Sequence, residues 1–296
     1  MKVIGYCRFS YFGITDTGRR IATEEDAQTL LWTKNRMACR FHLFKNLLIP
    51  SLKAQTDQDF IVYVITSKEM PRNYHTRLAR IVRDVPQIRI LKIENQDLHK
   101  VLRKTIFEDS DEGTKRTVQF RIDDDDALGV EVIEHLRKDG EFLPEKTLIS
   151  YPRGVTSFLD GEVARCSAQF RTYIAIGLAT VNGPGDYRNP FLMQHRRAFQ
   201  KRPSFVDPSF IAYICTLHSV NNTLGYDNIP SPTSVGRRSV ERILRNTPQL
   251  SQDTITDEAV EALATGFPYI SGKKLNGIVE HASQLGFAKP SGKKST

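Results

Sequence analysis

The stretch Thr117-Val-Gln-Phe-Arg-Ile-Asp-Asp-Asp-Asp-Ala-Leu128 is an apolar, strand-like run that ends in four consecutive carboxylates. Asp123, Asp124, Asp125 and Asp126 repel one another and have low propensity for strands and helix interiors, so packing alone does not explain them. Alternate residues of an extended segment point to one side, so Asp123 with Asp125, or Asp124 with Asp126, can bind one Mg²⁺ or Mn²⁺ ion. The plainer interpretation is a solvated acidic turn or a helix N-terminus, which favours negative charge. We favour the metal site.

Strand-like and helix-like segments alternate ahead of the four aspartates. Apolar runs rich in β-branched and aromatic residues predict buried strands, and apolar residues at helical spacing predict helices between them. The predicted strands cover residues 3–9, 60–66 and 88–93, and the predicted helices cover residues 36–54, 71–82 and 98–107. Pro50 is expected to kink the first of these helices or to end its regular part. This order predicts an α/β fold with a mostly parallel sheet, in which sites form at the carboxyl ends of strands.

The chain after the aspartates has shorter elements. A helix is predicted over residues 128–137 with Gly140 as its stop, and Asp160-Gly161 is a typical hairpin turn. The last strand ends at His218. The other predicted elements are strands at 147–151, 154–159, 168–176 and 210–217, helices at 235–245, 257–264 and 274–285, and a disordered tail at 289–296.

The composition is that of an ordinary globular protein. The chain has 296 residues and a mass of 33.7 kDa, with 40% hydrophobic and 26% charged residues, which is enough to bury a sizeable core. It has no apolar run of the roughly 20 residues that span a bilayer, and its N-terminus lacks the pattern of a signal peptide. We therefore expect a cytoplasmic protein. Its four cysteines are widely scattered, which predicts buried free thiols rather than a zinc knuckle or disulfides.

The net charge of +8 and the pI near 9.3 indicate an anionic partner. Nucleic acid, an anionic membrane surface and a phosphate-bearing small molecule all fit this charge. Arginine and lysine are spread along the chain in short groups such as Arg19-Arg20, without the basic block or the aromatic-basic repeat of a nucleic-acid module. We therefore expect a phosphate-bearing substrate and no nucleic acid, and peripheral contact with the anionic inner face of a membrane stays compatible with the charge.

Several segments together indicate a family. An N-terminal strand, an alternating α/β half, an acidic run after the fourth strand and a later histidine after another strand resemble a GT-A glycosyltransferase with its DxD motif. More narrowly, five segments resemble the bacterial putative rhamnosyltransferase family over residues 1–225, and their order is fairly specific. These segments are Arg8-Phe-Ser-Tyr-Phe-Gly13, Pro50-Ser-Leu-Lys-Ala-Gln55, Val64-Ile-Thr-Ser67, Arg121-Ile-Asp-Asp-Asp-Asp-Ala-Leu128, and His218 with Asn221.

The resemblance implies a fold and a division of the chain. The fold would be GT-A-like, that is Rossmann-like, with a mostly parallel mixed sheet flanked by helices. Residues 1–225 would form the catalytic domain, with a nucleotide-binding half at 1–126 and an acceptor half at 127–225. Residues 226–288 would be a helical C-terminal appendage, followed by the disordered tail.

The resemblance also implies an activity. The enzyme would be a metal-dependent glycosyltransferase of the hexosyltransferase type, which moves a sugar from a nucleotide-sugar donor to a carbohydrate or lipid-linked acceptor. The family's name alone suggests rhamnose. The departing nucleoside diphosphate gains negative charge, so a divalent ion that bridges its phosphates lowers the barrier without proton transfer.

Residue roles follow from the resemblance. Asp125 and Asp126 would lie nearest to the Mn²⁺ or Mg²⁺ ion, with His218 as a third ligand, although the DxD register between the two alternate pairs stays open. Asp123 and Asp124 would face the nucleoside ribose. Two residues at the end of the first strand, Arg8 and Ser10, would hold the nucleotide. Arg121 is expected either to bind the diphosphate or to pair with an aspartate, and His218 could instead bond a backbone carbonyl.

Other interpretations compete with this one. Another Mg²⁺ enzyme, a phosphatase or a nucleotidyltransferase, fits an α/β sheet, although haloacid-dehalogenase-like phosphatases usually carry their DxD on the first strand. A basic module that binds nucleic acid or a membrane surface is the non-enzymatic alternative. His195 is expected on a solvated basic surface or in a flap over the diphosphate. The catalytic base stays unknown, because none of the carboxylates in the acceptor half stands out from an ordinary turn residue: Asp160, Glu162, Asp186 and Asp207.

Overall fold

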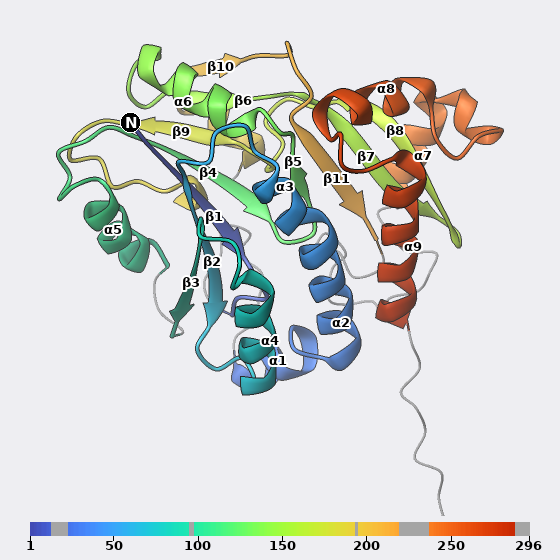
Figure 1. The fold of residues 1–296 in the computed structure, drawn as a ribbon, viewed down its shortest axis with the longest axis horizontal. Helices are drawn as coiled ribbons and strands as arrows, with labels where there is room; N and C mark the ends of the chain where they lie inside the picture. Colours follow the sequence, from blue (N-terminus) through green and yellow to red (C-terminus); the bar gives the residue numbers. More distant parts are fainter. Residues whose placement is uncertain (13–22, 95–97, 193–194, 219–236, 288–296) are drawn as a thin grey trace, which may run out of the picture.

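A seven-stranded mixed sheet forms the larger part of the fold (Figure 1). The computed structural model describes residues 1–12, 23–94, 98–192, 195–218 and 237–287. The strand order is β10-β6-β9-β4-β1-β2-β3, in which β4, β1, β2 and β3 are parallel neighbours and β9 runs antiparallel to β4 and β6. The bounds are β1 (Lys2–Arg8), β2 (Ile61–Ser67), β3 (Ile88–Ile93), β4 (Thr117–Asp123), β6 (Leu148–Ser150), β9 (Ala179–Asn182) and β10 (Ser204–Val206). The predicted α/β class and mostly parallel mixed sheet are confirmed.

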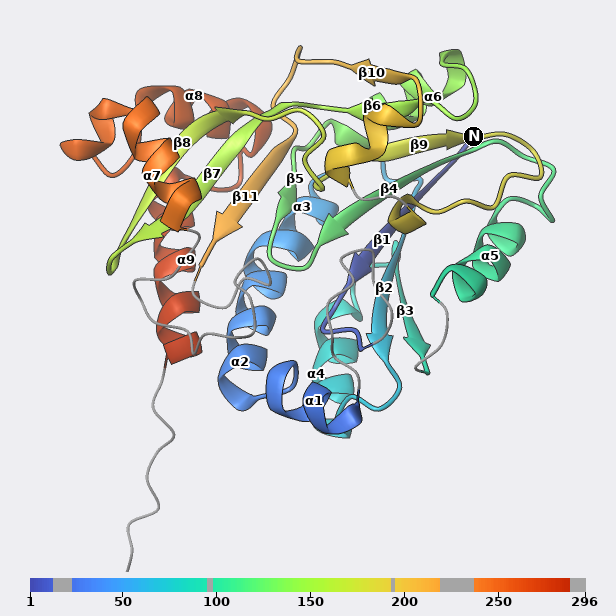
Figure 2. The same ribbon diagram turned by 180° about the vertical axis from the view of Figure 1, so that it is seen from behind.

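A second sheet of four strands lies beside the first, in the order β5-β11-β7-β8 (Figure 2). Its strands are β5 (Ala127–Leu128), β7 (Arg153–Asp160), β8 (Val163–Phe170) and β11 (Tyr213–Leu217). The chain leaves the first sheet at Asp123 and enters the second at Ala127, where β5 pairs antiparallel with β11. The aspartates therefore form the junction between the two sheets. The predicted hairpin at Asp160-Gly161 is confirmed, and Gly161 has the positive φ of 67° that such a turn requires.

Helices cover both faces of both sheets. One face of the first sheet packs against α2, α3, α4 and α6, and the other packs against α5. The second sheet packs against α8 and α9 on one face and against α7 on the other. Their bounds are α1 (Glu24–Leu30), α2 (Lys34–Leu43), α3 (Ile49–Lys53), α4 (Arg72–Val82), α5 (Leu98–Asp109), α6 (Val132–Phe142), α7 (Arg237–Asn246), α8 (Asp257–Gly266) and α9 (Gly272–Phe287), with a π-helix η1 (Phe44–Leu48) and 3₁₀ turns η2 (Pro190–Leu192), η3 (His195–Gln200) and η4 (Pro248–Ser251).

Helix α2 is shared by the two cores. Its residues Met37 and Phe41 pack against the first sheet, whereas Cys39 and Leu43 pack with the second sheet and α9. Pro50 is the second residue of the short helix α3, which follows a π-helical turn, as expected where a residue without an N–H interrupts the regular ladder. The regular α-helix thus ends ahead of Pro50, which is one of the two outcomes expected for this residue. Because α2 lies between the sheets, its polar residues on the intervening face point toward the junction.

Two predicted elements are misplaced. The helix expected at 128–137 begins four residues later, because Leu128 belongs to β5 and pairs with β11. The helix also continues through Gly140, where it was expected to stop. A Cβ at Gly140 would lie 2.2 Å from Val118 Cγ2, so this glycine permits close packing of helix on sheet. The strand expected at 168–176 is also wrong: β8 ends at Phe170, because its register is set by the hairpin turn, and β9 was not predicted.

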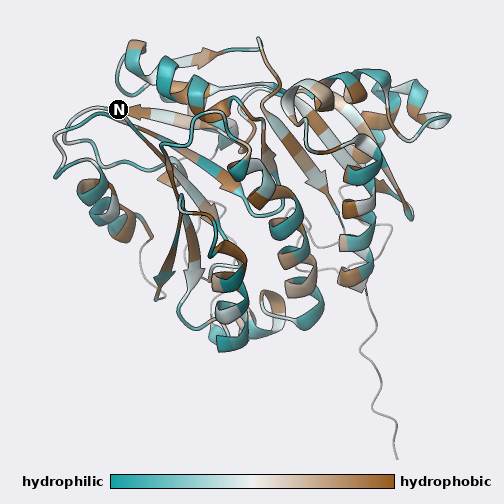
Figure 3. Cartoon of the chain, in the orientation of Figure 1, coloured by the Kyte–Doolittle hydropathy of each residue, from teal (hydrophilic) through white to brown (hydrophobic). Residues whose placement is uncertain are grey.

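The C-terminal helices share a core with the rest of the chain. Residues of α8 and α9 bury apolar side chains against β7, β8 and α2, including Leu263, Leu275 and Ile278. The expected boundary at 225–226, the tail at 289–296 and Asn221 lie outside the described residues, and the division into domains stays a prediction. Figure 3 shows apolar residues concentrated in the strands and polar ones along the outer helix faces. Within the described ranges, no helix is long and apolar enough to cross a membrane.

Candidate active site

The aspartate run is fixed where the ends of β4, β11 and α2 meet. Asp123 ends β4, where its register partner is Arg8 of β1. The Thr216 backbone N–H donates to Asp126 Oδ1 at 3.0 Å, and the Thr216 hydroxyl donates to the Asp125 carbonyl at 2.7 Å. These bonds tie the acidic turn to β11, so Asp124, Asp125 and Asp126 belong to a buried junction rather than to a solvated loop.

A buried arginine from α2 pairs with two of the aspartates. Arg40 is only 3% exposed, and its Nη1 lies 2.7 Å from Asp125 Oδ2 while its Nη2 contacts Asp124 Oδ1. Burial alone lowers the pKa of Arg40, but the negative charges around it, that of Asp125 first, raise the pKa above its usual value. Arg40 therefore stays charged and supplies the acidic turn with one fixed positive charge.

His218 completes the buried network from the end of β11. Its Nε2 lies 2.9 Å from Asp125 Oδ2, and its Nδ1 lies 3.7 Å from Cys39 Sγ. Burial lowers the pKa of His218, although the bond to Asp125 opposes this shift, so the ring is neutral at neutral pH. Burial raises the pKa of Cys39 to about 12, which keeps its thiol protonated. The expected meeting of His218 with the aspartates is thus present at Asp125.

Asp125 and Asp126 have opposite electrostatic environments. Burial disfavours the charge on Asp125, yet Arg40 and His218 outweigh burial and hold the pKa of this carboxyl well below its usual range. Burial and the negative charges of Asp125 and Asp123 raise the pKa of Asp126 well above its usual value. Asp125 is therefore compensated by the charge of Arg40 and the hydrogen bond to His218, whereas Asp126 is the carboxylate with most to gain from an added cation.

Replacement of Asp126 by asparagine is expected to raise the melting temperature of the metal-free protein. Because the pKa of Asp126 is raised, the folded chain binds this proton more tightly than the unfolded chain. The stability from that proton is complete below the unfolded pKa of about 3.9 and is lost as pH rises through the folded pKa. The variant keeps an oxygen that accepts from the Thr216 N–H. Its melting temperature should exceed that of wild type by about 2 to 4 °C for each kcal/mol, and this difference should grow from acidic to neutral buffer. Thermal melts of both proteins in a chelator check this, and a lower melting temperature at neutral pH would contradict it.

The expected nucleotide-binding residues form two groups. The guanidinium carbons of Arg8 and Arg121 lie 4.6 Å and 5.0 Å from the centre of the Phe191 ring, and Arg121 Nη2 lies 3.9 Å from Asp123 Oδ1. These residues meet at the carboxyl ends of β1 and β4. Ser10, with a positive φ of 46°, instead accepts a hydrogen bond from Arg36 Nη1 at 2.9 Å. The pairing of Arg121 with an aspartate was one of the two alternatives expected for it.

The sequence interpretation missed Arg40, Arg36 and Phe191. A signal for the two arginines was present, because both lie four residues apart on a helix whose neighbours, such as Met37, were predicted to be buried. A buried arginine requires an acidic partner, and the aspartate run was the obvious candidate. Phe191 had no comparable signal, since its contact with the strand ends depends on a loop.

The carboxylates of the expected acceptor half are engaged in local interactions. Asp160 accepts from Arg165 Nε at 2.8 Å, and Asp186 accepts from Arg188 Nε at 2.7 Å. Asp207 Oδ1 accepts from the Ser209 N–H at 2.8 Å. Glu162 is exposed at the tip of the β7–β8 hairpin. None of them is assigned as a base here.

The residues of the aspartate run fit a divalent cation in charge and in ligand type. Asp124, Asp125 and Asp126 are all buried. Among the described residues, Arg40 pairs with Asp124 and Asp125, no lysine or arginine pairs with Asp126, and Asp124 Oδ2 accepts no hydrogen bond. Carboxylate oxygens with one imidazole suit Mn²⁺, and oxygens alone suit Mg²⁺. The ligand atoms of Asp125, Asp126 and His218 do not all lie within 4.8 Å of one another. An ion would therefore require Asp126 to turn toward them.

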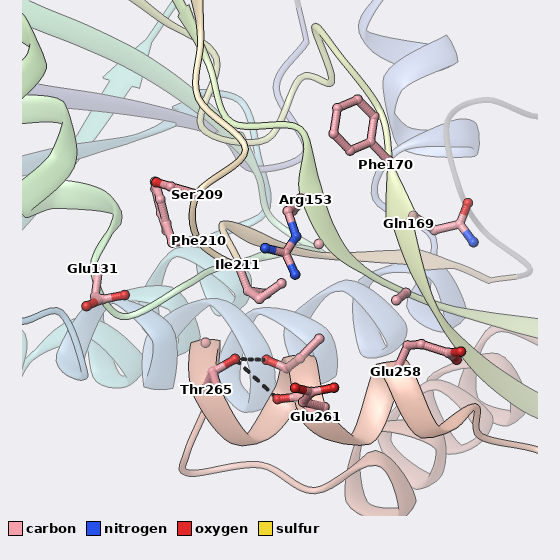
Figure 4. Close-up of a pocket in the computed structure, with 14 residues that line it drawn as sticks. Glu131, Arg153, Gln169, Phe170, Ser209, Phe210, Ile211, Glu258, Glu261 and Thr265 are labelled. Carbon is pink, nitrogen blue, oxygen red and sulfur yellow. Dashed lines mark hydrogen bonds between the residues drawn. The ribbon is translucent and has the colours of Figure 1, made fainter.

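A separate cavity of about 590 Å³ lies beyond the opposite end of β11 (Figure 4). It opens between β7, β8, the segment that leads into β11, and α8. Its polar lining includes Glu131, Arg153, Glu258 and Glu261, and Phe210 forms part of its wall. It contains none of the residues expected to bind the donor or the metal.

Comparison with known proteins decides the family. A family model described as "Putative rhamnosyl transferase" matches residues 2–226. The chain belongs to this family. The expected family is thereby confirmed, and its description agrees with the expected enzyme class, a glycosyltransferase. No curated protein matches the chain.

Solved structures give distant likenesses to this rhamnosyl transferase family member. Residues 1–349 of S. aureus TarS are 12% identical with a TM-score of 0.39, and the match covers 73% of this chain and 60% of that one. The same TarS segment in complex with UDP-GlcNAc is 11% identical with a TM-score of 0.40, over 91% of this chain and 73% of that one. A Bacillus anthracis protein described as a putative glucose-1-phosphate thymidylyltransferase is 11% identical with a TM-score of 0.37, over 78% of this chain and 98% of that one. The chain thus spans about 60% of the length of the first TarS structure.

Proposed function

We propose that this glycosyltransferase moves a sugar from a nucleotide-sugar donor to a carbohydrate or lipid-linked acceptor, with Mn²⁺ or Mg²⁺ at the aspartate run. The family description suggests rhamnose as the sugar. The observation that carries the proposal is that, among the described residues, the buried Arg40 pairs with Asp124 and Asp125 while no lysine or arginine pairs with the buried Asp126. A buried negative charge without a partner is costly, and a divalent ion with a bound diphosphate supplies the missing positive charge.

The proposed division of labour follows the positions of the side chains. Asp125, Asp126 and His218 would hold the ion. The ion would stabilise the charge of the departing diphosphate. Arg8 and Arg121, stacked on Phe191 at the ends of β1 and β4, provide positive charge for the phosphates. Asp123, which is partly exposed beside them, can accept hydrogen bonds from the ribose. Ser10 acts with Arg36 at the edge of the same site.

Arg40 has a positioning role in this proposal. Its contacts with Asp124 and Asp125 keep both carboxylates in place, and its charge keeps Asp125 ionised before any ligand arrives. Preorganised charges stabilise a transition state without reorganisation during the reaction. The acceptor is proposed to bind in the expected acceptor half, residues 127–225, because the proposed nucleotide-binding residues lie at the ends of β1 and β4 in the other half.

A thermal-shift panel of UDP, GDP, TDP and CDP tests the proposal. One of these nucleotides is expected to raise the melting temperature in Mn²⁺ and not in EDTA. A ligand present at 100 times its Kd adds about 2.7 kcal/mol to the free energy of unfolding, so the shift is measurable. Stabilisation that is equal in Mn²⁺ and EDTA would count against the metal, and no shift with any nucleotide would contradict the proposed donor class.

A further inference from the structure

A second group of metal-ligating side chains lies away from the aspartate run. His135 and Asp139 are four residues apart on α6, so both project from one face of the helix. Asp207 follows β10 and faces them, with its Oδ2 3.8 Å from His135 Nδ1. One ligand atom from each of the three residues lies within 4.8 Å of the other two. Nothing in the proposed transfer reaction uses these residues.

Neighbouring groups hold each of the three side chains in place. The His135 ring stacks on Phe210, with centroids 3.9 Å apart and an interplanar angle of 15°. The Tyr151 hydroxyl donates to Asp139 Oδ2 at 2.7 Å, and the Ser209 N–H donates to Asp207 Oδ1 at 2.8 Å. One oxygen of each carboxylate is thus held from outside the group, and the other is left for a shared ligand. Metal ligands in proteins are commonly oriented by outer hydrogen bonds of this kind.

An ordinary ion pair explains the group less well. A protonated His135 could pair with Asp207, but the second carboxylate, Asp139, would then add negative charge without a partner. In the part of the chain that the structure covers, neither aspartate forms an ion pair with a lysine or an arginine. Two carboxylates and one imidazole at this separation offer the ligand atoms that a divalent ion takes.

We propose that His135, Asp139 and Asp207 form a second metal site that takes a divalent transition ion such as Zn²⁺. One nitrogen and two oxygen ligands favour Zn²⁺ over Mg²⁺, which prefers oxygen ligands only. Bonds of about 2.1 Å in a tetrahedral site place ligand atoms about 3.4 Å apart, so the 3.8 Å between His135 and Asp207 requires only a small contraction.

The role of this ion is structural. Helix α6 packs on the first sheet, and Asp207 begins the segment that passes Ser209 and Phe210 into β11. Both of these residues line the 590 Å³ cavity (Figure 4). An ion bound by α6 and Asp207 would therefore fasten this segment, and with it the start of β11, to the first sheet. The site is independent of the proposed transfer reaction.

Metal binding by the full-length chain, stripped with a chelator, tests the site. Zn²⁺ is titrated by calorimetry, and Co²⁺ is followed by its visible absorption, which reports coordination directly. We expect wild type to bind Zn²⁺ with a rise in melting temperature. His135→Asn and Asp207→Asn should each weaken this binding by at least about 100-fold, which is beyond the effect of an outer-shell change.

Two control variants identify the site that is measured. His42→Asn alters a histidine outside the proposed site, whose ring centroid lies 4.7 Å from that of His281. Asp126→Asn alters the aspartate run. Both should keep the Zn²⁺ affinity and the Co²⁺ spectrum of this site. If His135→Asn does not fold, the Zn²⁺ affinity of Asp207→Asn, which lies in a surface segment, provides the test. Undiminished binding in Asp207→Asn, or complete loss of Zn²⁺ binding in Asp126→Asn, would overturn the proposal.

Discussion

Asp126→Asn is expected to lower the rate of sugar transfer by about 100-fold or more while it leaves the protein at least as stable as wild type. Asp126 is buried at 6% exposure, and its raised pKa shows that its charge is unfavourable in the metal-free fold. Removal of one group that stabilises developing charge costs about 10²- to 10³-fold in rate. Release of nucleoside diphosphate from the donor, measured for both proteins with Mn²⁺, checks this prediction.

This variant separates function from folding better than a change at Asp125. Asp125 pairs with the buried Arg40 and His218, so its loss would both remove a proposed metal ligand and leave a buried guanidinium short of a partner. A lower transfer rate in Asp125→Ala could then result from unfolding and would not identify a ligand. A stable Asp126→Asn with undiminished transfer would show that Asp126 takes no part in the reaction, and an active double variant of Asp125 and Asp126 would refute the metal site.

Arg40→Met is expected to destabilise the protein by about 3 to 5 kcal/mol, the usual cost of removing one partner of a buried ion pair. Arg40 is the fixed cation between Asp124 and Asp125, and methionine fills much of its volume without its charge. The two carboxylates would then face each other in a buried site. Denaturant unfolding of wild type and variant measures the difference.

Two further variants show whether charge is the cause. Arg40→Met combined with Asp125→Asn should recover part of the loss, because one of the two uncompensated charges is removed. Arg83→Met is the matched control, since the Arg83 side chain is 75% exposed and, among the described residues, pairs with Asp84 alone, and it should change stability by less than about 0.5 kcal/mol. Equal destabilisation by Arg40→Met and Arg83→Met would contradict a buried network.

The α/β half of the fold could be predicted because its strands are buried on both faces. The runs that form β1 and β2 are largely apolar, β4 is buried at all but its last residue, and the helices between them have apolar residues at helical spacing. Both signals are local. The start of α6 was misplaced because Leu128 continues the helical pattern but pairs with Tyr213, and no local pattern reveals a partner 85 positions away.

The candidate site shows the same limit. The rule that sites form at the carboxyl ends of strands brought His218 and the aspartates together correctly at Asp125. The rule does not say what else reaches that edge, and Arg40 arrives there from a helix between two sheets. A bound metal and a buried arginine can each explain why the aspartates lie together. The two explanations differ at Asp126, because Arg40 pairs with Asp124 and Asp125 and not with Asp126.

The most direct test of the aspartate run as the donor site compares the melting temperatures of wild type and Asp126→Asn with the nucleotide chosen by the panel. Each protein is measured with Mn²⁺ and with EDTA. We predict that the Mn²⁺-dependent rise seen in wild type is lost or strongly reduced in Asp126→Asn, although the variant melts higher without metal. An equal Mn²⁺-dependent rise in both proteins would show that the nucleotide and the ion bind without Asp126 and would contradict the account.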